Sequence, residues 1–551
     1  MMMKRRLKLL HTLWALAALP ALAQQAPDAG QTLQQLQPTA PSAPKPARAI
    51  DIQGPALAPT LPGGMQVSLQ TVRFSGNTVF SDSALQAVVG DVSGKPFDMA
   101  QLRALVEAVN QHYRRHGHPF ARAFLPPQAL TDGTLRIEVV EGRYGEVRAM
   151  GDDARLTAQA QAFLAPLRPG ALIESAPLER ASLLLNDQPG ITASPTLRPG
   201  QTMGSGDLDV SIQRTQPYNV ELGLDNHGNR YTGQTRARLN LDLNSPFRLG
   251  DQATLRSIVT AQGLWFGQLG YSLPLGASGL RGQVGHAHTA YELGQEFAAL
   301  RANGTADVSS LGLSYPWLRS QGANVTVSAT YQHKTLTDKQ NAASTRSDKF
   351  SQTLPVALDF DRRDSIGGGG ITRGSLSWTP GQLRLDGSQR AADASTARRQ
   401  GRFDKANLDL ARLQALPKHL GLFVRMSTQW TTHNLDSSEG FGLGGPAGVR
   451  AYPVGEGYGD RGWVGQVELR YAAGAWGPYV FHDAGSVAKN ARPWLTGPNE
   501  RHIAGHGVGL RFQQAAWRFD ASVAWRSQGG HAESDTSQRN PTAWLSASHR
   551  F

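Results

Sequence analysis

The residue types that could do chemistry in this chain include two groups of histidines. His502 and His506 are four positions apart, but the glutamate that follows the first histidine of an H-E-x-x-H zinc site is missing. His112, His116 and His118 flank the end of an expected helix, and no carboxylate joins them nearby. We interpret both groups as ordinary polar histidines, so no metal ligand is expected.

The other enzyme signatures are also incomplete. Three residues separate Gly90 from Gly94, whereas a phosphate-binding loop has four, and Pro96 stands where that loop needs Ser or Thr. The G-x-S-x-G motif of a nucleophilic serine does not occur. The sequence therefore predicts a protein that is not an enzyme, with no catalytic residue and no cofactor.

One arginine and one aspartate could form a specific contact. The glycine-rich segment 433–462 contains Val449, Arg450, Ala451 and Tyr452 in a row, and segment 481–485 reads F-H-D-A-G. A guanidinium and a carboxylate, here those of Arg450 and Asp483, can form a bidentate, charge-assisted contact. Residue types alone favour a solvated loop arginine and an ordinary strand aspartate instead.

The spacing within segment 481–485 argues for the contact. Phe481 and Asp483 are two positions apart, so on a strand they share one face. If Asp483 faces a water-filled barrel interior, Phe481 does too, and a phenyl ring is out of place there unless something packs on it. A loop folded back inside would supply that partner, and the Arg450 guanidinium could also stack on the ring.

Composition narrows the class of protein. The chain has 551 residues with 60 glycines, 18% charged residues, a formal net charge of +12 and no cysteine. The lack of cysteine excludes disulfide scaffolds, cysteine-ligated zinc, iron–sulfur clusters and thiol catalysis. No apolar run of about 18 residues follows the N-terminal segment, which excludes a bundle of transmembrane helices. The basic charges are spread rather than clustered, so nucleic acid is not an expected partner.

The first 65 residues read as a targeting segment and a linker. Residues 1–23 have four basic residues among the first eight, a short apolar stretch and an A-x-A site, which predicts a signal peptide and export. Residues 24–65 contain eight prolines among Ala and Gln, which favours an extended or disordered linker. Within it, Gln31–Gln37 could form two turns of helix.

Two compact α+β modules are expected next, at residues 66–142 and 143–215. The first combines strands with a helix that Asp98 and Gln101 would begin as a capping box. The second has strands near 145–150, 191–197 and 208–213, with helices between them. Their similar order predicts a repeated unit.

Residues 216–551 alternate apolar and polar residues in stretches of about ten. A soluble β-sandwich would alternate too, and alternation does not reveal which face is outside. The export signal, the terminal Phe551 and the alternation of short with long connections favour a membrane barrel. We predict sixteen antiparallel strands. Their charged side chains are expected to line a polar lumen; these include Arg236, Arg238, Glu468 and Arg470.

These segments together resemble the outer-membrane transporters of two-partner secretion, of the haemolysin and filamentous-haemagglutinin type, within the Omp85 superfamily. Residues 449–452 match the V-R-G-Y loop motif, with Ala451 in place of glycine, and Phe481, Asp483 and Gly485 match the F-x-D-x-G strand motif. Shorter motifs resemble the two POTRA modules of the family; they are Phe74–Asn77, Leu125–Gln128, Val139–Gly142, Leu178–Arg180 and Leu184–Gly190.

The resemblance implies a monomeric all-β transmembrane barrel of sixteen strands, with two POTRA modules in the periplasm. The loop carrying Arg450 would enter the pore and pair with Asp483, and a helix near 31–37 would plug the pore at rest. Glycine at 451 would serve a positive φ or a close approach, so Ala451 bears on the loop's backbone geometry.

The same resemblance implies the partners and the function. The partners are a large secreted exoprotein of adhesin or haemolysin type, outer-membrane lipid, and a barrel-assembly machinery that reads Phe551. The POTRA modules would recognise the unfolded exoprotein, and the barrel would pass it to the cell surface. The alternatives are an Omp85-type assembly factor, which usually has more modules, a diffusion porin, which needs none, and, more distantly, an outer-membrane enzyme.

Overall fold

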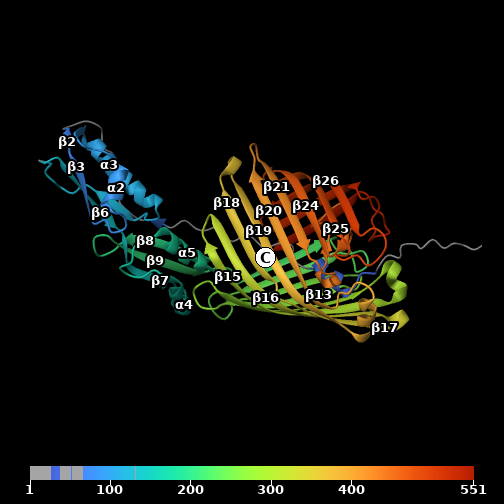
Figure 1. Cartoon of the computed structure of the whole chain (residues 1–551). Helices are drawn as coiled ribbons and strands as arrows, with labels where there is room; N and C mark the ends of the chain where they lie inside the picture. Colours follow the sequence, from blue (N-terminus) through green and yellow to red (C-terminus); the bar gives the residue numbers. More distant parts are fainter. Residues whose placement is uncertain (1–25, 37–50, 53–65, 131) are drawn as a thin grey trace, which may run out of the picture.

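Two small α+β modules precede a closed β-barrel and lie together at one end of it (Figure 1). The predicted signal peptide, residues 1–23, lies outside the described residues, as does most of the predicted linker. The computed structural model describes residues 26–36, 51–52, 66–130 and 132–551.

The first module packs two helices on a small sheet in which β6 lies between β3 and β5. The predicted capping box of Asp98 and Gln101 begins α3. Helix α2, which Ser81 caps, was not predicted, because eight residues carry too little periodicity to reveal it. The elements are β2 (Val67–Leu69), β3 (Thr71–Ser75), α2 (Asp82–Val89), β4 (Lys95–Phe97), α3 (Met99–Arg115), β5 (Ala121–Phe124) and β6 (Thr134–Glu141).

A buried carboxylate ties the parts of this module together. Glu141, at the end of β6, accepts hydrogen bonds from the main chain of Thr78 and Val79, both at 2.7 Å, and from the Tyr113 hydroxyl at 2.9 Å. The Thr78 hydroxyl also donates to it. Burial by itself would raise the pKa of Glu141, but these hydrogen bonds outweigh burial, and the pKa lies below its usual value.

Glu141→Gln is expected to loosen the first module, because a neutral amide accepts these bonds more weakly than a carboxylate. The loss is roughly 1–2 kcal/mol of local stability. Since the folded-state pKa is lowered, the stabilisation is present above the unfolded pKa and is lost as pH falls through the folded pKa. Amide hydrogen exchange at Thr78 and Val79 checks both effects. Glu138→Gln, on the opposite face of β6, is the control, and equal exchange in the two variants would contradict the prediction.

The second module repeats the same topology. Its last strand β9 again lies between the first strand β7, which it pairs in parallel, and the edge strand β8. A short strand from the linker, β1, pairs with the outer edge of β8. The elements are β1 (Asp51–Ile52), β7 (Arg143–Met150), α4 (Ala154–Leu164), α5 (Ser175–Asn186), β8 (Ile191–Pro199) and β9 (Ser205–Arg214).

The barrel consists of sixteen antiparallel strands, which confirms the predicted fold class. It closes because β10 pairs with β28. Segments β17 and β18 both pair with β16 and β19, so they are two parts of one strand interrupted at Leu354 and Pro355. The strands are β10 (Tyr218–Asp225), β11 (Arg236–Asn244), β12 (Gln252–Thr260), β13 (Trp265–Pro274), β14 (Arg281–Glu292), β15 (Ala302–Arg319), β16 (Ala323–Gln340), β17 (Thr345–Thr353) with β18 (Val356–Asp364), β19 (Gly370–Leu385), β20 (Gly401–Ala415), β21 (Leu420–Trp430), β24 (Arg461–Tyr471), β25 (Trp476–Ala488), β26 (Glu500–Gln514), β27 (Trp517–Gln528) and β28 (Thr542–Arg550).

The two barrel faces differ as the alternation predicted. Large apolar side chains such as Leu376 and Trp378 are about half exposed on the outside, whereas Ser377 and Thr379 between and beside them line an interior cavity. The connection between β16 and β17 is short, because β16 continues to Gln340 and β17 begins at Thr345. Within the described ranges, no helix combines the length and the apolar character needed to cross a membrane.

Side chains bind the second module to the near end of the barrel. Arg319, at the end of β15, donates two hydrogen bonds of 2.7 Å to Asp187. Arg281 donates to the Gln188 side chain at 3.0 Å. The module is therefore held at the rim where the short turns lie.

Candidate functional site

The long segment between β21 and β24 folds back into the barrel. It contains η4 (Ser437–Glu439) and two short strands that pair with each other, β22 (Phe441–Gly442) and β23 (Tyr458–Gly459). Leu443 and Val449 are fully buried. We call residues 431–460 the inner loop.

The structure brings Arg450 of the inner loop and Asp483 of β25 together. The Arg450 guanidinium donates through Nε at 2.8 Å and through Nη2 at 2.7 Å to the two carboxylate oxygens of Asp483. The Arg450 main-chain N–H also donates to Asp483, at 3.1 Å. Asp483 is fully buried and Arg450 is 4% exposed. The contact is thus a bidentate ion pair out of solvent, and not a solvated loop arginine.

A second carboxylate completes this ion pair and was not predicted as part of it. Glu468 of β24 accepts from Arg450 Nη1 at 2.6 Å and from Arg470 Nε at 2.7 Å. Arg511 Nη1 donates to Glu468 at 3.1 Å, and its Nε donates to Asp520 at 2.7 Å. Three guanidiniums thus meet three carboxylates, which leaves the cluster electrically balanced.

The predicted lumen charges are therefore paired rather than free. Glu468 and Arg470 belong to the cluster just described. Arg236 and Arg238 both contact Asp225, each at 2.7 Å. Sequence alternation indicated which way these side chains point but not which partner each finds.

Phe481 lies beneath Arg450, as its spacing from Asp483 predicted. The guanidinium carbon of Arg450 is 3.5 Å from the centre of the Phe481 ring, and Phe481 is 5% exposed. Leu443 and Val449 of the inner loop join Phe481 in one buried apolar cluster. Gly485 makes room for this packing, because a Cβ there would lie 3.0 Å from Leu443.

Neighbouring residues of the motif fix the position of the inner loop. The Tyr452 hydroxyl donates to the carbonyl oxygens of Gln528 and Gly530, at 2.8 and 3.0 Å. The Trp544 indole N–H donates to the Arg450 carbonyl oxygen at 2.7 Å. The loop is thus anchored to β25, β27 and β28 at once.

Ala451 of the inner loop packs against strand β26 at a position, 505, where the strand has a glycine. Ala451 is not among the residues with a positive φ, so its backbone does not need glycine's freedom. Its Cβ instead lies where Gly505 of β26 has no side chain, since a Cβ on Gly505 would be 2.3 Å away. Close approach, and not backbone conformation, is the constraint at position 451.

Gly505→Ala is therefore expected to unseat the inner loop. Overpacking of this kind costs roughly 1–3 kcal/mol and should raise the rate of trypsin cleavage after Arg450 about tenfold. Ala451→Gly in the same chain removes that clash and should restore part of the protection. The remaining protection from trypsin is not restored, because the Cβ added at position 505 also lies 2.8 Å from the Trp525 carbonyl oxygen. Equal cleavage of the single and double variants would contradict this account.

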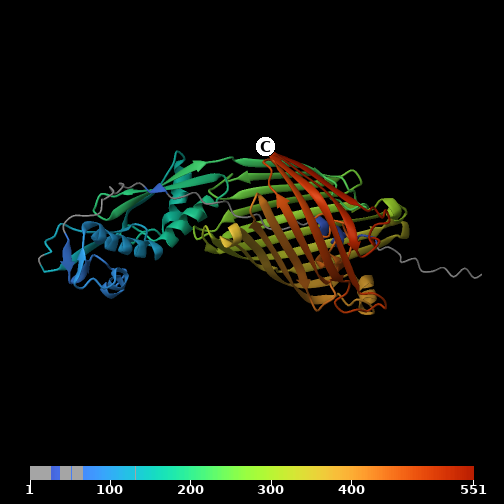
Figure 2. The same ribbon diagram turned by 90° about the horizontal axis from the view of Figure 1, so that it is seen from above.

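A helix occupies the far part of the lumen. The structure places α1 (Ala29–Leu36) inside the barrel, where a helix over 31–37 was predicted (Figure 2). Leu33 and Leu36 pack in one apolar cluster with Phe266, Tyr291 and Leu336 of the wall. Helix α1 therefore has an apolar seat on β13, β14 and β16.

Ion pairs join this helix to the wall and to the inner loop. Lys349 of β17 lies 3.0 Å from Asp28, just before α1, and 3.2 Å from Asp436 of the inner loop. The Ala29 N–H donates to Asp338 at 2.8 Å. Helix, loop and wall thus share one lysine, which the sequence did not reveal.

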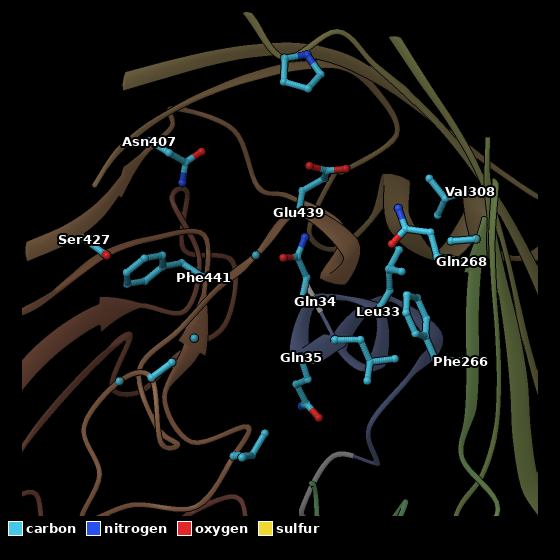
Figure 3. Close-up of a pocket in the computed structure, with 18 of the residues that line it drawn as sticks. Leu33, Gln34, Gln35, Phe266, Gln268, Val308, Asn407, Ser427, Glu439 and Phe441 are labelled. Carbon is cyan, nitrogen blue, oxygen red and sulfur yellow. The ribbon is translucent and has the colours of Figure 1, made fainter. Parts of the chain in front are cut away.

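A polar cavity of about 1180 Å³ remains between α1, the inner loop and the wall. Figure 3 shows Gln34 of α1 and Glu439 of the inner loop on one side, with Asn407 and Ser427 of the wall across from them. Lys334 and Lys405 of the wall both contact Glu439, at 2.5 and 2.9 Å. The lumen is narrowed by helix and loop rather than filled.

The remaining predicted residues lie away from this site. Phe551 follows β28, donates its N–H to the Val220 carbonyl oxygen at 2.8 Å and is 55% exposed. His112 and His116 lie next to each other near Phe80 in the first module, with ring centres 4.2 Å apart and ring planes tilted by 40°. No group of three metal-ligating side chains occurs in the part of the chain that the structure describes.

Relatives of this chain are transporters by name. The heme/hemopexin transporter protein HuxB of Haemophilus influenzae strain 86-028NP is 26% identical over 456 residues, 80% of each chain. The outer membrane transporter CdiB of Dickeya dadantii strain 3937 is 23% identical over 433 residues, 77% of this chain and 75% of that protein.

Solved structures share the fold. CdiB from Escherichia coli superposes with a TM-score of 0.70 at 19% identity, over 89% of this chain and 91% of that one. BamA from Haemophilus ducreyi lacking POTRA domains 1–3 superposes with a TM-score of 0.53 at 14% identity, over 88% of this chain and all of that one.

The family itself is shown by sequence. Residues 67–142 match the ShlB-type POTRA domain. Residues 204–512, more than half of the chain, match the family described as haemolysin secretion/activation protein ShlB/FhaC/HecB. This chain belongs to the ShlB/FhaC/HecB family of haemolysin secretion and activation proteins.

Proposed function

We propose that this chain is an outer-membrane pore that secretes a large exoprotein in two-partner secretion, with its two modules in the periplasm. The observation that carries the proposal is a closed, polar-lined barrel whose lumen is narrowed by a helix and a loop of the same chain. A diffusion porin has no need of the two modules at its rim.

The client reaches the pore unfolded. An extended chain is the form that a sixteen-stranded barrel admits, and a polar wall keeps such a chain hydrated. The periplasm holds no ATP, so the free energy of transport comes from binding on one side and from folding on the other. Folding at the cell surface then prevents return.

Opening the pore requires that α1 leave its seat. The contacts that hold it include ion pairs of Asp28 and a hydrogen bond to Asp338, which water can replace as the helix moves. The inner loop is held by the more deeply buried Arg450. We therefore assign α1 the role of a plug and the Arg450–Asp483 pair that of a latch that positions the inner loop.

The outer surface and the last residue suit a membrane protein that another machinery inserts. Exposed aromatic and aliphatic side chains would face lipid; they include Trp265, Trp317, Trp378, Trp430, Trp463, Trp476 and Trp517. Phe551 stands at the exposed end of the last strand, where a barrel-assembly machinery could read it.

An assembly factor for other barrels is the second candidate, because BamA shares the fold. Mass spectrometry of culture supernatants from strains with and without the gene separates the two. Loss of one very large protein, with the outer-membrane profile unchanged, supports secretion. An unchanged supernatant with depleted outer-membrane barrels supports assembly instead.

A further inference from the structure

Two arginines are neighbours on the outer wall of the barrel, near the rim opposite the modules. Arg384 lies at the end of β19 and Arg402 at the start of β20, and these two strands pair with each other (Figure 1). Gln382 lies directly opposite Arg402, and Arg384 is two positions beyond Gln382, so the three side chains share one face. Diagonal neighbours of this kind are about 7–8 Å apart, so both guanidiniums can reach one small ligand.

The residues next to the two arginines point to the opposite side of the wall. Leu383 and Phe403 are buried in one apolar cluster with Leu435 of the inner loop, which lies inside the barrel. Because successive side chains of a strand alternate between its faces, Arg384 and Arg402 point outward, and both are exposed. Packing on the inner side therefore holds the backbone that presents the arginines on the outer side.

The two arginines lie just beyond the apolar belt of the barrel. Trp378 of β19 and Trp430 of β21 both pair with Ala406 of β20, and both indole side chains are about half exposed. Tryptophans on the outside of a barrel mark the level of the lipid headgroups. Arg402 is four positions beyond Ala406, which is about 13 Å along the strand and about 10 Å in height at the usual tilt of about 35–45°. Long arginine side chains at this height can lean down to the headgroups of the outer leaflet.

Neither guanidinium has a hydrogen-bond or ion-pair partner in the part of the chain that the structure describes. The carboxylates on the same outer surface have other partners. Asp404 lies 3.3 Å from Nδ1 of His433, and Asp348 lies 2.7 Å from Nε of Arg346. Two uncompensated positive charges therefore face the headgroup layer, and basic clusters at this level attract anionic lipids.

We propose that Arg384, Arg402 and Gln382 bind a phosphate group of an outer-leaflet glycolipid, the lipid A part of lipopolysaccharide. A guanidinium forms bidentate, charge-assisted hydrogen bonds with phosphate, and the glutamine amide adds a further donor. Leu376 and Trp378, on the same outer face nearer the modules, offer apolar surface to the acyl chains, which a free phosphate would not need. The site lies outside the lumen and goes beyond the proposed secretion function, because it fixes the barrel in one leaflet.

Titration of fluorescently labelled lipopolysaccharide onto the full-length protein in detergent tests this site. We expect Arg384→Gln with Arg402→Gln to bind it at least tenfold more weakly than the wild type, because both charges that pair with the phosphate are gone. Arg362→Gln with Lys418→Gln removes two exposed cations near the opposite rim and is the matched control, with wild-type binding expected. Heat-modifiable mobility verifies that both variants form the barrel. Equal binding by the two double variants would overturn the proposal.

The chemistry of the ligand is tested by changing the probe rather than the protein. Lipopolysaccharide stripped of its lipid A phosphates should bind the wild type as weakly as the intact lipid binds the Arg384→Gln/Arg402→Gln variant. Equal binding of the stripped and intact lipids to the wild type would overturn a phosphate site. Inorganic phosphate at the concentration of the lipid should not compete, since it lacks acyl chains, and full competition would overturn the assignment to a lipid.

Discussion

Arg450→Ala is expected to reduce secretion at least tenfold while the barrel still assembles. The substitution leaves Asp483 and Glu468 without their shared guanidinium, and both are buried. Breaking a buried ion pair from one side costs on the order of 3–5 kcal/mol, because the remaining charge is uncompensated. The lost contacts are those that hold the inner loop to the barrel wall, whereas the main-chain hydrogen bonds between the sixteen strands remain. The loop should therefore detach while the barrel stays intact.

Exoprotein in the supernatant and heat-modifiable mobility of the barrel are measured together. Asp483→Ala should give the same defect, because it removes the other half of the pair. Arg346→Ala is the matched control, since the Arg346–Asp348 pair is exposed and worth about 0–1 kcal/mol. Wild-type secretion in both Arg450→Ala and Asp483→Ala would remove the latch role from this pair.

Lys349→Ala is expected to release α1 and make the pore leak. Lys349 faces Asp28, Asp436 and Asp338, so its removal leaves three carboxylates around one site. Their mutual repulsion opposes the apolar seat of Leu33 and Leu36 and should shift the helix out of the lumen. Single-channel conductance in planar bilayers should rise several-fold, and cells should become sensitive to large antibiotics.

The control for this variant is Lys339→Ala on β16. Lys339 follows Asp338 directly, so its side chain points to the opposite face of the strand. Deleting residues 26–36 should reproduce the leak of Lys349→Ala. If conductance stays at the wild-type level in both, α1 does not plug the pore.

Much of this architecture is predictable from sequence, for physical reasons that differ between parts. Period-two alternation predicts barrel strands because each residue faces either lipid or lumen. The capping box at Asp98 predicts the start of α3 because it satisfies two helix-end groups locally. The contact of Arg450 with Asp483 follows from Phe481, whose place on the same face demands a packing partner.

Other features depend on which residues the fold brings together. Nothing near Glu468 in the sequence indicates that it binds Arg450, because the two are 18 positions apart and the loop between them turns back. The fit of Ala451 against Gly505 likewise joins the inner loop to the distant strand β26. The hydrogen bonds from Ala123 to Asn110 and from Ala193 to Asn186 were missed because an asparagine in a helix carries no mark of the strand it contacts. Helix α2 was missed for its short length.

Photo-cross-linking within one strand tests most directly whether the exoprotein crosses the lumen. Ser377 of β19 lines the cavity, and its neighbour Leu376 is 49% exposed on the outer face. A photoreactive amino acid is placed at one position or the other, and cells are irradiated during secretion. The account predicts an adduct with the exoprotein at position 377 and none at 376. An adduct at 376 without one at 377, or at neither position while secretion continues, would contradict passage through this barrel.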